Sequence, residues 1–263
     1  MTPLLDVQHL TVTFERPGST QTAVDDLSLT IQPGETLGLV GESGSGKSVT
    51  ALAILRLLQP PGKVAAGQVF FEGRDLLQLS ESEMRAVRGG RISLIFQEPM
   101  TALNPTMRVG EQIAEALTSH GIEKDEARQR VGELLEAVRI TDAGKRARDY
   151  PHQLSGGMRQ RVMIAIALAC RPPLVIADEP TTALDVTIQA QVLDMLRELK
   201  QRFNLALLLI THDFGVIAEL ADRVAVMQGG QLVEHGPVRQ ILREPSHAYT
   251  RRLLRAVPGM SGR

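Results

Sequence analysis

The sequence predicts an α/β fold in which a largely parallel sheet alternates with helices and is interrupted by a helical insert. Short apolar runs with the character of buried strands occupy residues 36–40, 91–96, 173–178 and 205–213. A helical pattern separates the last two of these runs, over residues 186–203. Between about residues 99 and 150, apolar residues recur at three- and four-residue spacing among many charges, which is typical of amphipathic helices. Buried strands that alternate with helices indicate an α/β sheet.

Other segments have the pattern of shorter, exposed strands. Alternation at Leu10, Val12 and Phe14 predicts an opening strand, and residues 24–31 predict a second one before a Pro33–Gly34 turn. A further short strand is expected within residues 67–73. Residues 221–236 resemble an antiparallel hairpin that turns at Gly229–Gly230.

Composition limits the class of protein. The chain has 263 residues, of which 43% are hydrophobic, so it is long enough to bury a substantial core. It carries 29 basic and 30 acidic residues, a balance that gives no general electrostatic reason to expect a nucleic-acid partner. The single cysteine, Cys170, excludes an intramolecular disulfide and an all-cysteine metal or iron–sulfur site within this sequence. No run approaches the ~20 apolar residues of a membrane span, and a soluble, cytoplasmic protein is expected.

A glycine-rich loop follows the first buried strand and precedes a helical segment. Gly41-Glu-Ser-Gly-Ser-Gly-Lys-Ser48 fits the pattern G-x-x-x-x-G-K-[ST], in which backbone N–H groups surround phosphates. Lys47 is predicted to neutralise the β- and γ-phosphates of a nucleotide, and the Ser48 hydroxyl to ligate Mg²⁺. The predicted phosphate-binding residues are Gly41, Ser43, Gly44, Ser45, Gly46, Lys47 and Ser48.

Polar side chains lie at the ends of three of the other buried strands. Asp178 is predicted to hold Mg²⁺, and Glu179 to orient or deprotonate an attacking water. His212 is predicted to contact the γ-phosphate or to hold the water and the glutamate in place. Gln97 follows the strand at residues 91–96, from which its amide could reach both Mg²⁺ and the water.

A second loop of phosphate-binding character lies directly ahead of the apolar stretch 158–169. In Gln-Leu-Ser-Gly-Gly (residues 153–157), Ser155 has the position of a helix N-cap, and Gly156 and Gly157 expose N–H groups at the positive end of a helix dipole. One nucleotide does not obviously need two such loops. The second loop therefore needs a separate explanation.

As a set, these motifs resemble the ATP-binding subunits of ABC transporters, in the order phosphate loop, Gln97, Leu-Ser-Gly-Gly signature, acidic strand, Ala-Leu-Asp (residues 183–185) and His212. The resemblance implies a P-loop NTPase (RecA-like) core with an antiparallel β subdomain and an inserted α-helical subdomain. One ABC ATPase domain would then cover residues 1–263. Its nucleotide-binding core would comprise 1–98 and 155–235, its helical subdomain 99–154, and its C-terminal extension 236–263.

The same resemblance implies that two such subunits sandwich two ATP molecules with Mg²⁺. The signature of one subunit, Ser155 to Gly157, would cap the γ-phosphate held by the phosphate loop of the other. Asp185 would signal across the interface between them. Phe14 would stack on adenine, although a core position beside Leu10 and Val12 is an open alternative. Met158 departs from the glutamine that is commoner after the two glycines.

Three stretches, beginning at Gln97, Asp178 and Glu244, resemble the ATPases of dipeptide, oligopeptide and nickel or metal–opine importers. No cysteine follows Cys170, which favours the shorter, nickel/opine-like members over those with an iron–sulfur segment. The implied partners are a second, different ATPase subunit, two integral-membrane permease subunits and an extracytoplasmic solute-binding protein, and no nucleic acid. The implied location is the cytoplasmic side of the inner membrane. A soluble non-transport ABC ATPase and a subunit serving efflux stay open as alternatives.

Overall fold

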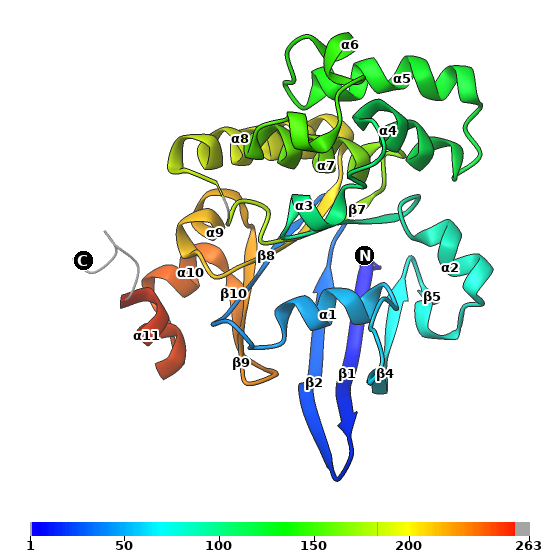
Figure 1. The fold of residues 1–263 in the computed structure, drawn as a ribbon. Helices are drawn as coiled ribbons and strands as arrows, with labels where there is room; N and C mark the ends of the chain where they lie inside the picture. Colours follow the sequence, from blue (N-terminus) through cyan, green and yellow to red (C-terminus); the bar gives the residue numbers. More distant parts are fainter. Residues whose placement is uncertain (1, 183, 256–263) are drawn as a thin grey trace. The chain divides into compact units, whose positions relative to one another are not determined.

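The computed structural model describes residues 2–182 and 184–255 and contains the predicted parts: parallel strands, an antiparallel β part and a helical part (Figure 1). Ala183 of the Ala-Leu-Asp motif and residues 256–263 of the predicted C-terminal extension lie outside the described residues. The chain forms two compact units, Met1–Met84 with Ala206–Arg263, and Arg85–Leu205. The predicted division into core, helical subdomain and extension stays a prediction.

The first unit contains an antiparallel sheet in the order β2 (Ser19–Ile31), β1 (Leu5–Arg16), β4 (Gly62–Phe71) and β5 (Arg74–Asp75). The ends of β1 and β2 form a long hairpin, in dark blue in Figure 1. The pairing of β1 is irregular between Leu10 and Val12 and again between Val12 and Thr13. Val12 and Thr13 are consecutive and both buried, so the simple alternation predicted for this strand ends there.

The same unit contains parallel strands that carry the phosphate loop. The strand order is β10 (Gln231–Pro237), β9 (Arg223–Gln228), β3 (Thr36–Val40) and β8 (Ala206–Thr211). Strand β3 pairs in parallel with both β8 and β9, and β10 pairs antiparallel with β9, as predicted for this hairpin. Every residue of β3 and β8 is buried, which explains their continuous apolar runs. The unit's helices include α1 (Lys47–Ile54), α9 (Phe214–Leu220), α10 (Val238–Arg243) and α11 (Ala248–Arg255).

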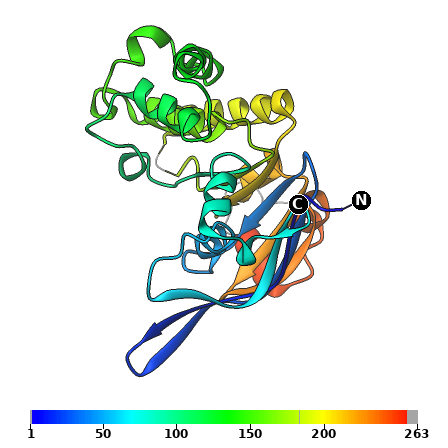
Figure 2. The same cartoon turned by 90° about the vertical axis from the view of Figure 1, so that its right-hand side faces the viewer.

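The second unit joins a parallel strand pair to a group of helices. Strands β6 (Ile92–Ile95) and β7 (Leu174–Asp178) pair in parallel. The predicted amphipathic helices are α4 (Val109–Thr118) and α5 (Lys124–Ala137), which pack against each other and against α7 (Gly156–Leu168), as Figure 2 shows. Leu117, Ala127 and Ala169 form a buried cluster among these helices. The remaining helices are α3 (Pro99–Ala102), α6 (Ala143–Arg146) and α8 (Val186–Phe203).

Among the described residues, no helix combines the length and the apolar character that a bilayer crossing requires.

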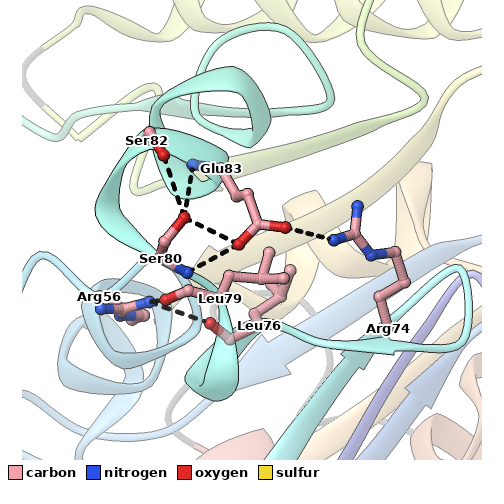
Figure 3. Close-up of polar contacts among 7 residues, drawn as sticks. All are labelled: Arg56, Arg74, Leu76, Leu79, Ser80, Ser82 and Glu83. Carbon is pink, nitrogen blue, oxygen red and sulfur yellow. Dashed lines mark hydrogen bonds and ion pairs between the residues drawn. The ribbon is translucent and has the colours of Figure 1, made fainter.

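Helix α2 (Glu81–Val87) begins with a reciprocal cap that the sequence analysis did not predict (Figure 3). Ser80 Oγ accepts from the backbone N–H of Glu83 at 3.3 Å, and Glu83 Oε2 accepts from the N–H of Ser80 at 2.9 Å. Arg74 donates to the other carboxylate oxygen of Glu83 at 2.8 Å. The Ser80 backbone and hydroxyl, and then Arg74, lower the pKa of Glu83. Arg56 donates to the carbonyls of Leu76 and Leu79 and so fixes the chain ahead of the cap.

Removing the capping hydroxyl is expected to destabilise this helix locally. The Ser80→Ala variant leaves the N–H of Glu83 without its side-chain acceptor, and the loss of such a cap typically costs about 1 kcal/mol. Urea unfolding followed by circular dichroism measures the difference, with Ser82→Ala as the matched control on the same turn. Equal unfolding midpoints for Ser80→Ala and wild type would show that the cap contributes nothing.

Candidate functional site

The phosphate loop connects β3 to α1, and its glycines are required by geometry. Gly44 (φ 78°) and Gly46 (φ 104°) have left-handed backbone conformations, which side chains disfavour. A Cβ on Gly46 would lie 2.5 Å from the carbonyl oxygen of Ala23, and one on Gly41 would lie 2.3 Å from that of Met227. The loop is therefore held tightly by neighbouring backbone, and its shape depends on glycine at these positions.

Lys47 is the first residue of α1, and its side chain is folded back into the loop. It is only 5% exposed, and its Nζ donates to the carbonyls of Gly41 at 2.8 Å and Glu42 at 2.9 Å. Ser45 is buried beside it, whereas Ser43 and Ser48 are exposed. An ammonium group thus lies in a backbone cradle at a helix N-terminus, an arrangement suited to binding phosphate. Ser48, the second residue of α1, is exposed beside this cradle, and its hydroxyl is the kind of oxygen donor that Mg²⁺ prefers.

His212 follows β8, the strand that neighbours β3. Because Val40 is aligned with Thr211 in a parallel pair, Gly41 and His212 leave the sheet at the same edge. His212 is exposed there, and the next residue, Asp213, caps α9 by accepting from the N–H of Gly215 at 2.7 Å. The structure therefore places His212 at the strand edge from which the phosphate loop starts.

In the second unit, Gln97 and Glu179 are in direct contact. Ile95 of β6 is aligned with Ala177 of β7, so the residues after the two strands leave at one edge. Gln97 Nε2 donates to Glu179 Oε2 at 2.9 Å. Asp178 is the last residue of β7 and is partly exposed. Two residues that were predicted independently are thus brought together, with Asp178 adjacent in sequence.

Thr182 also holds Glu179, a contact that the sequence analysis missed. Its Oγ1 donates to the same carboxylate oxygen at 2.8 Å, and its N–H donates to the Glu179 carbonyl at 3.3 Å. Glu179 has φ 47°, a left-handed conformation that is strained for a residue with a long side chain. Such strain persists where surrounding contacts fix the residue, and it is concentrated at functional sites. The bonds from Thr182 Oγ1 and Gln97 Nε2 orient the carboxylate of Glu179, and the bond from the Thr182 N–H holds its backbone.

The signature loop forms the N-terminus of α7. Ser155 caps this helix and accepts from the N–H of Met158 at 3.4 Å. Asp185 caps α8 in the same way, accepting from the N–H of Ile188 at 2.9 Å. A Cβ on Gly157 would lie 2.8 Å from Cγ2 of Ile188, so the starts of α7 and α8 approach closely only because this residue is glycine.

These two helix starts open onto one cavity of about 520 Å³. Its lining includes Arg139 and Arg161, which the sequence analysis did not single out. Arg161 donates to the Arg139 carbonyl at 2.9 Å and to Gln191 at 2.8 Å. Burial and then the charge of Arg139 lower the pKa of Arg161. The lining residues from the predicted site are Ser155, Gly156, Gly157 and Asp185. Helix N-termini and guanidinium groups together favour an anionic ligand.

Phe14 does not share the core with Leu10 and Val12. Those two side chains are fully buried, whereas Phe14 is half-buried beyond the irregular part of β1. It is aligned with Gly62 of β4, and a Cβ on that glycine would lie 2.7 Å from the Phe14 ring. The core alternative for Phe14 is therefore wrong, and its stacking on adenine stays a prediction.

Comparison with protein families gives a match to the ABC transporter family over residues 24–182, more than half of the chain. The matched part contains the phosphate loop, Gln97, the signature, and the acids Asp178 and Glu179 at the end of β7.

The chain is also similar to two curated oligopeptide transport ATP-binding proteins named OppD. It is 54% identical to that of Salmonella typhimurium over 97% of this chain and 76% of the relative. It is 53% identical to that of Bacillus subtilis over 98% of this chain and 73% of the relative. Among solved structures, the ATP-binding cassette MJ0796, a post-hydrolysis dimer bound to ADP and Pi, has a TM-score of 0.80. It shares 28% identity over 89% of this chain and 99% of its own.

Proposed function

The chain belongs to the ABC transporter family as an ATP-binding protein of the oligopeptide-importer type, and from this premise we propose that it hydrolyses ATP to drive peptide uptake. The observation that carries the proposal is the buried Lys47 ammonium held by the loop carbonyls of Gly41 and Glu42 at a helix N-terminus. The relatives named above are oligopeptide transport proteins, so they support the peptide branch of the prediction and do not specifically support nickel.

In this proposal the phosphate loop binds ATP. Lys47 exchanges its loop carbonyls for the β- and γ-phosphate oxygens, and the loop N–H groups donate to the phosphates. Oxygen donors suited to Mg²⁺ come from Ser48, Gln97 and Asp178. When bound, the metal neutralises charge that develops on the phosphates. Phe14 stacks on the adenine.

Glu179 acts on the attacking water. A carboxylate orients a water and takes its proton as the water oxygen bonds to the γ-phosphorus, while the bond from that phosphorus to the β,γ-bridging oxygen breaks and ADP leaves, which is general-base catalysis. The hydrogen bonds from Gln97 and Thr182 to Oε2 hold this carboxylate in one orientation. His212 contacts the γ-phosphate or steadies the water.

The proposed assembly is a heterodimer with a second ATP-binding subunit, bound to two permease subunits on the cytoplasmic side of the inner membrane and supplied by an extracytoplasmic solute-binding protein. The helices between residues 99 and 150 dock the permeases near Gln97. Deletion of the gene is expected to abolish uptake of a labelled peptide and to spare nickel uptake. The opposite pattern would favour nickel, and increased retention of an exported compound would favour efflux.

The Lys47→Ala variant tests nucleotide binding directly. The contacts of the Lys47 ammonium with phosphate are charge-assisted hydrogen bonds worth about 1.5–3 kcal/mol. Without them, ATP affinity is expected to fall by about one to two orders of magnitude. Calorimetric titration of the purified chain with ATP measures this.

Lys63→Ala is the matched control, because Lys63 is an exposed lysine of the same unit that pairs with Glu15. Unchanged ATP affinity in Lys47→Ala would contradict the assignment of the loop.

A further inference from the structure

The C-terminal helix α11 contacts the phosphate loop through Tyr249. The backbone N–H of Glu42, the second residue of the loop, donates to Tyr249 Oη at 3.0 Å. Tyr249 is only 4% exposed, so packing fixes its ring and thereby the position of its hydroxyl beside Glu42. The two residues are 207 positions apart in the sequence and belong to the same compact unit.

Tyr249 and Lys47 bond to the same peptide group. The N–H of Glu42 and the C=O of Gly41 belong to one peptide plane, and in a trans peptide they point in opposite directions. The N–H donates to Tyr249, and the C=O accepts from Lys47 Nζ at 2.8 Å. The peptide is therefore held from both sides, and rotating it would break both bonds.

Helix α11 is itself tied to the sheet that carries the loop. Glu234 of β10 is buried, and its Oε1 accepts from the N–H and the hydroxyl of Ser246 at 2.6 and 2.7 Å. Its Oε2 accepts from the N–H of His247 at 3.1 Å. Bonds to an ionised carboxylate are stronger than neutral ones. This anchor sets the position of the segment that begins α11.

Arg252 adds a second, weaker contact. Its guanidinium lies over the Tyr249 ring, 5.2 Å from the centroid, and donates to Glu42 Oε1 at 3.4 Å. Both partners of this ion pair are exposed, so its contribution to stability is small. Arg252 thus contacts both the Tyr249 ring and the Glu42 side chain and helps to keep them next to each other.

We propose that Tyr249 is a positioning residue for the phosphate loop: it fixes the Gly41–Glu42 peptide so that the Lys47 ammonium is held ready for nucleotide phosphate. This inference rests on the proposed function in one respect, because it takes Lys47 to bind ATP. It assigns a physical role to the stretch Ser246-His-Ala-Tyr-Thr-Arg-Arg252, which the nucleotide-binding motifs leave without one.

The coupling works through the order of the loop. Without the hydroxyl, the peptide samples other orientations and the binding-competent loop is only a fraction of the population. Apparent affinity for ATP falls by that fraction.

The Tyr249→Phe variant removes the acceptor and keeps the ring. We expect a three- to tenfold weaker affinity for both ATP and ADP, about the effect of one net hydrogen bond. We also expect kcat within about twofold of wild type, because the reacting groups are untouched. Amide exchange at Glu42, followed by NMR, is expected to be faster. A purely structural role would lower the melting temperature and leave nucleotide affinity and the KM-against-kcat split unchanged.

Tyr150→Phe is the matched control, since Tyr150 is the chain's other tyrosine and is remote from α11 in sequence. Unchanged ATP affinity and unchanged Glu42 exchange in Tyr249→Phe would overturn the inference, as would a lower melting temperature with wild-type affinity. The proposed function is judged separately by Lys47→Ala. If Lys47→Ala weakens binding and Tyr249→Phe does not, only the role of Tyr249 is lost, whereas wild-type affinity in Lys47→Ala overturns both.

Discussion

The Glu179→Gln variant is expected to bind ATP with wild-type affinity and to hydrolyse it about 10²–10⁴-fold more slowly, the range typical of a lost general base. The amide has nearly the shape of the carboxylate, so Gln97 and Thr182 still have an oxygen to which they can donate. It cannot take a proton from water at neutral pH. Binding is spared because the phosphate contacts come from the loop around Lys47.

Phosphate release measured alongside ATP titration separates the two effects. Glu133→Gln is the matched control, because Glu133 is an exposed glutamate on α5. Hydrolysis by Glu179→Gln within about threefold of wild type would remove Glu179 from the role of general base. Loss of ATP binding in the same variant would instead make Glu179 part of the nucleotide-binding surface.

The sequence was most informative where a pattern repeats over several turns or fills a buried strand. Strands β3, β7 and β8 and helices α4, α5 and α8 occupy their predicted segments because continuous burial or a 3.6-residue period determines each locally. Helices α2 and α9 have only seven residues each, too few for a period to stand out. The alternation in β1 breaks at a bulge that depends on its pairing with β2 and β4.

The same distinction applies to the site. The glycine loop was recognised from local spacing, since its conformation depends on glycines a few residues apart. Gln97 contacts Glu179 because β6 pairs with β7. The sequence places each residue at the end of a strand, but it does not show that these two strands are neighbours. Thr182 and Tyr249 were missed because their bonds to Glu179 and Glu42 depend on tertiary packing. No local pattern marks such partners.

The Ser155→Arg variant is expected to abolish ATP turnover at the partner subunit's phosphate loop first, by at least about 100-fold, the size of losing one preorganised donor to a developing charge. Ser155 is exposed at the N-cap of α7, where α7 and α8 open onto their cavity. An arginine there fills space that a phosphate would need. It also removes a helix cap worth about 1 kcal/mol, so melting curves must show that the variant is folded.

In the assembled complex, each phosphate loop is disabled in turn by its lysine-to-alanine substitution, and nucleotide trapped at the remaining site is measured. With Ser155→Arg on this chain, the loop of Lys47 is expected to keep trapping nucleotide while the partner subunit's loop does not. Ser82→Arg is the matched control, because Ser82 is an exposed serine in the first turn of α2, outside the helices proposed to dock the permeases. If Ser155→Arg impairs only the nucleotide held by Lys47, the signature serves its own chain. Binding to the ATP of a neighbouring subunit would then not explain the second phosphate-type loop, residues 153–157.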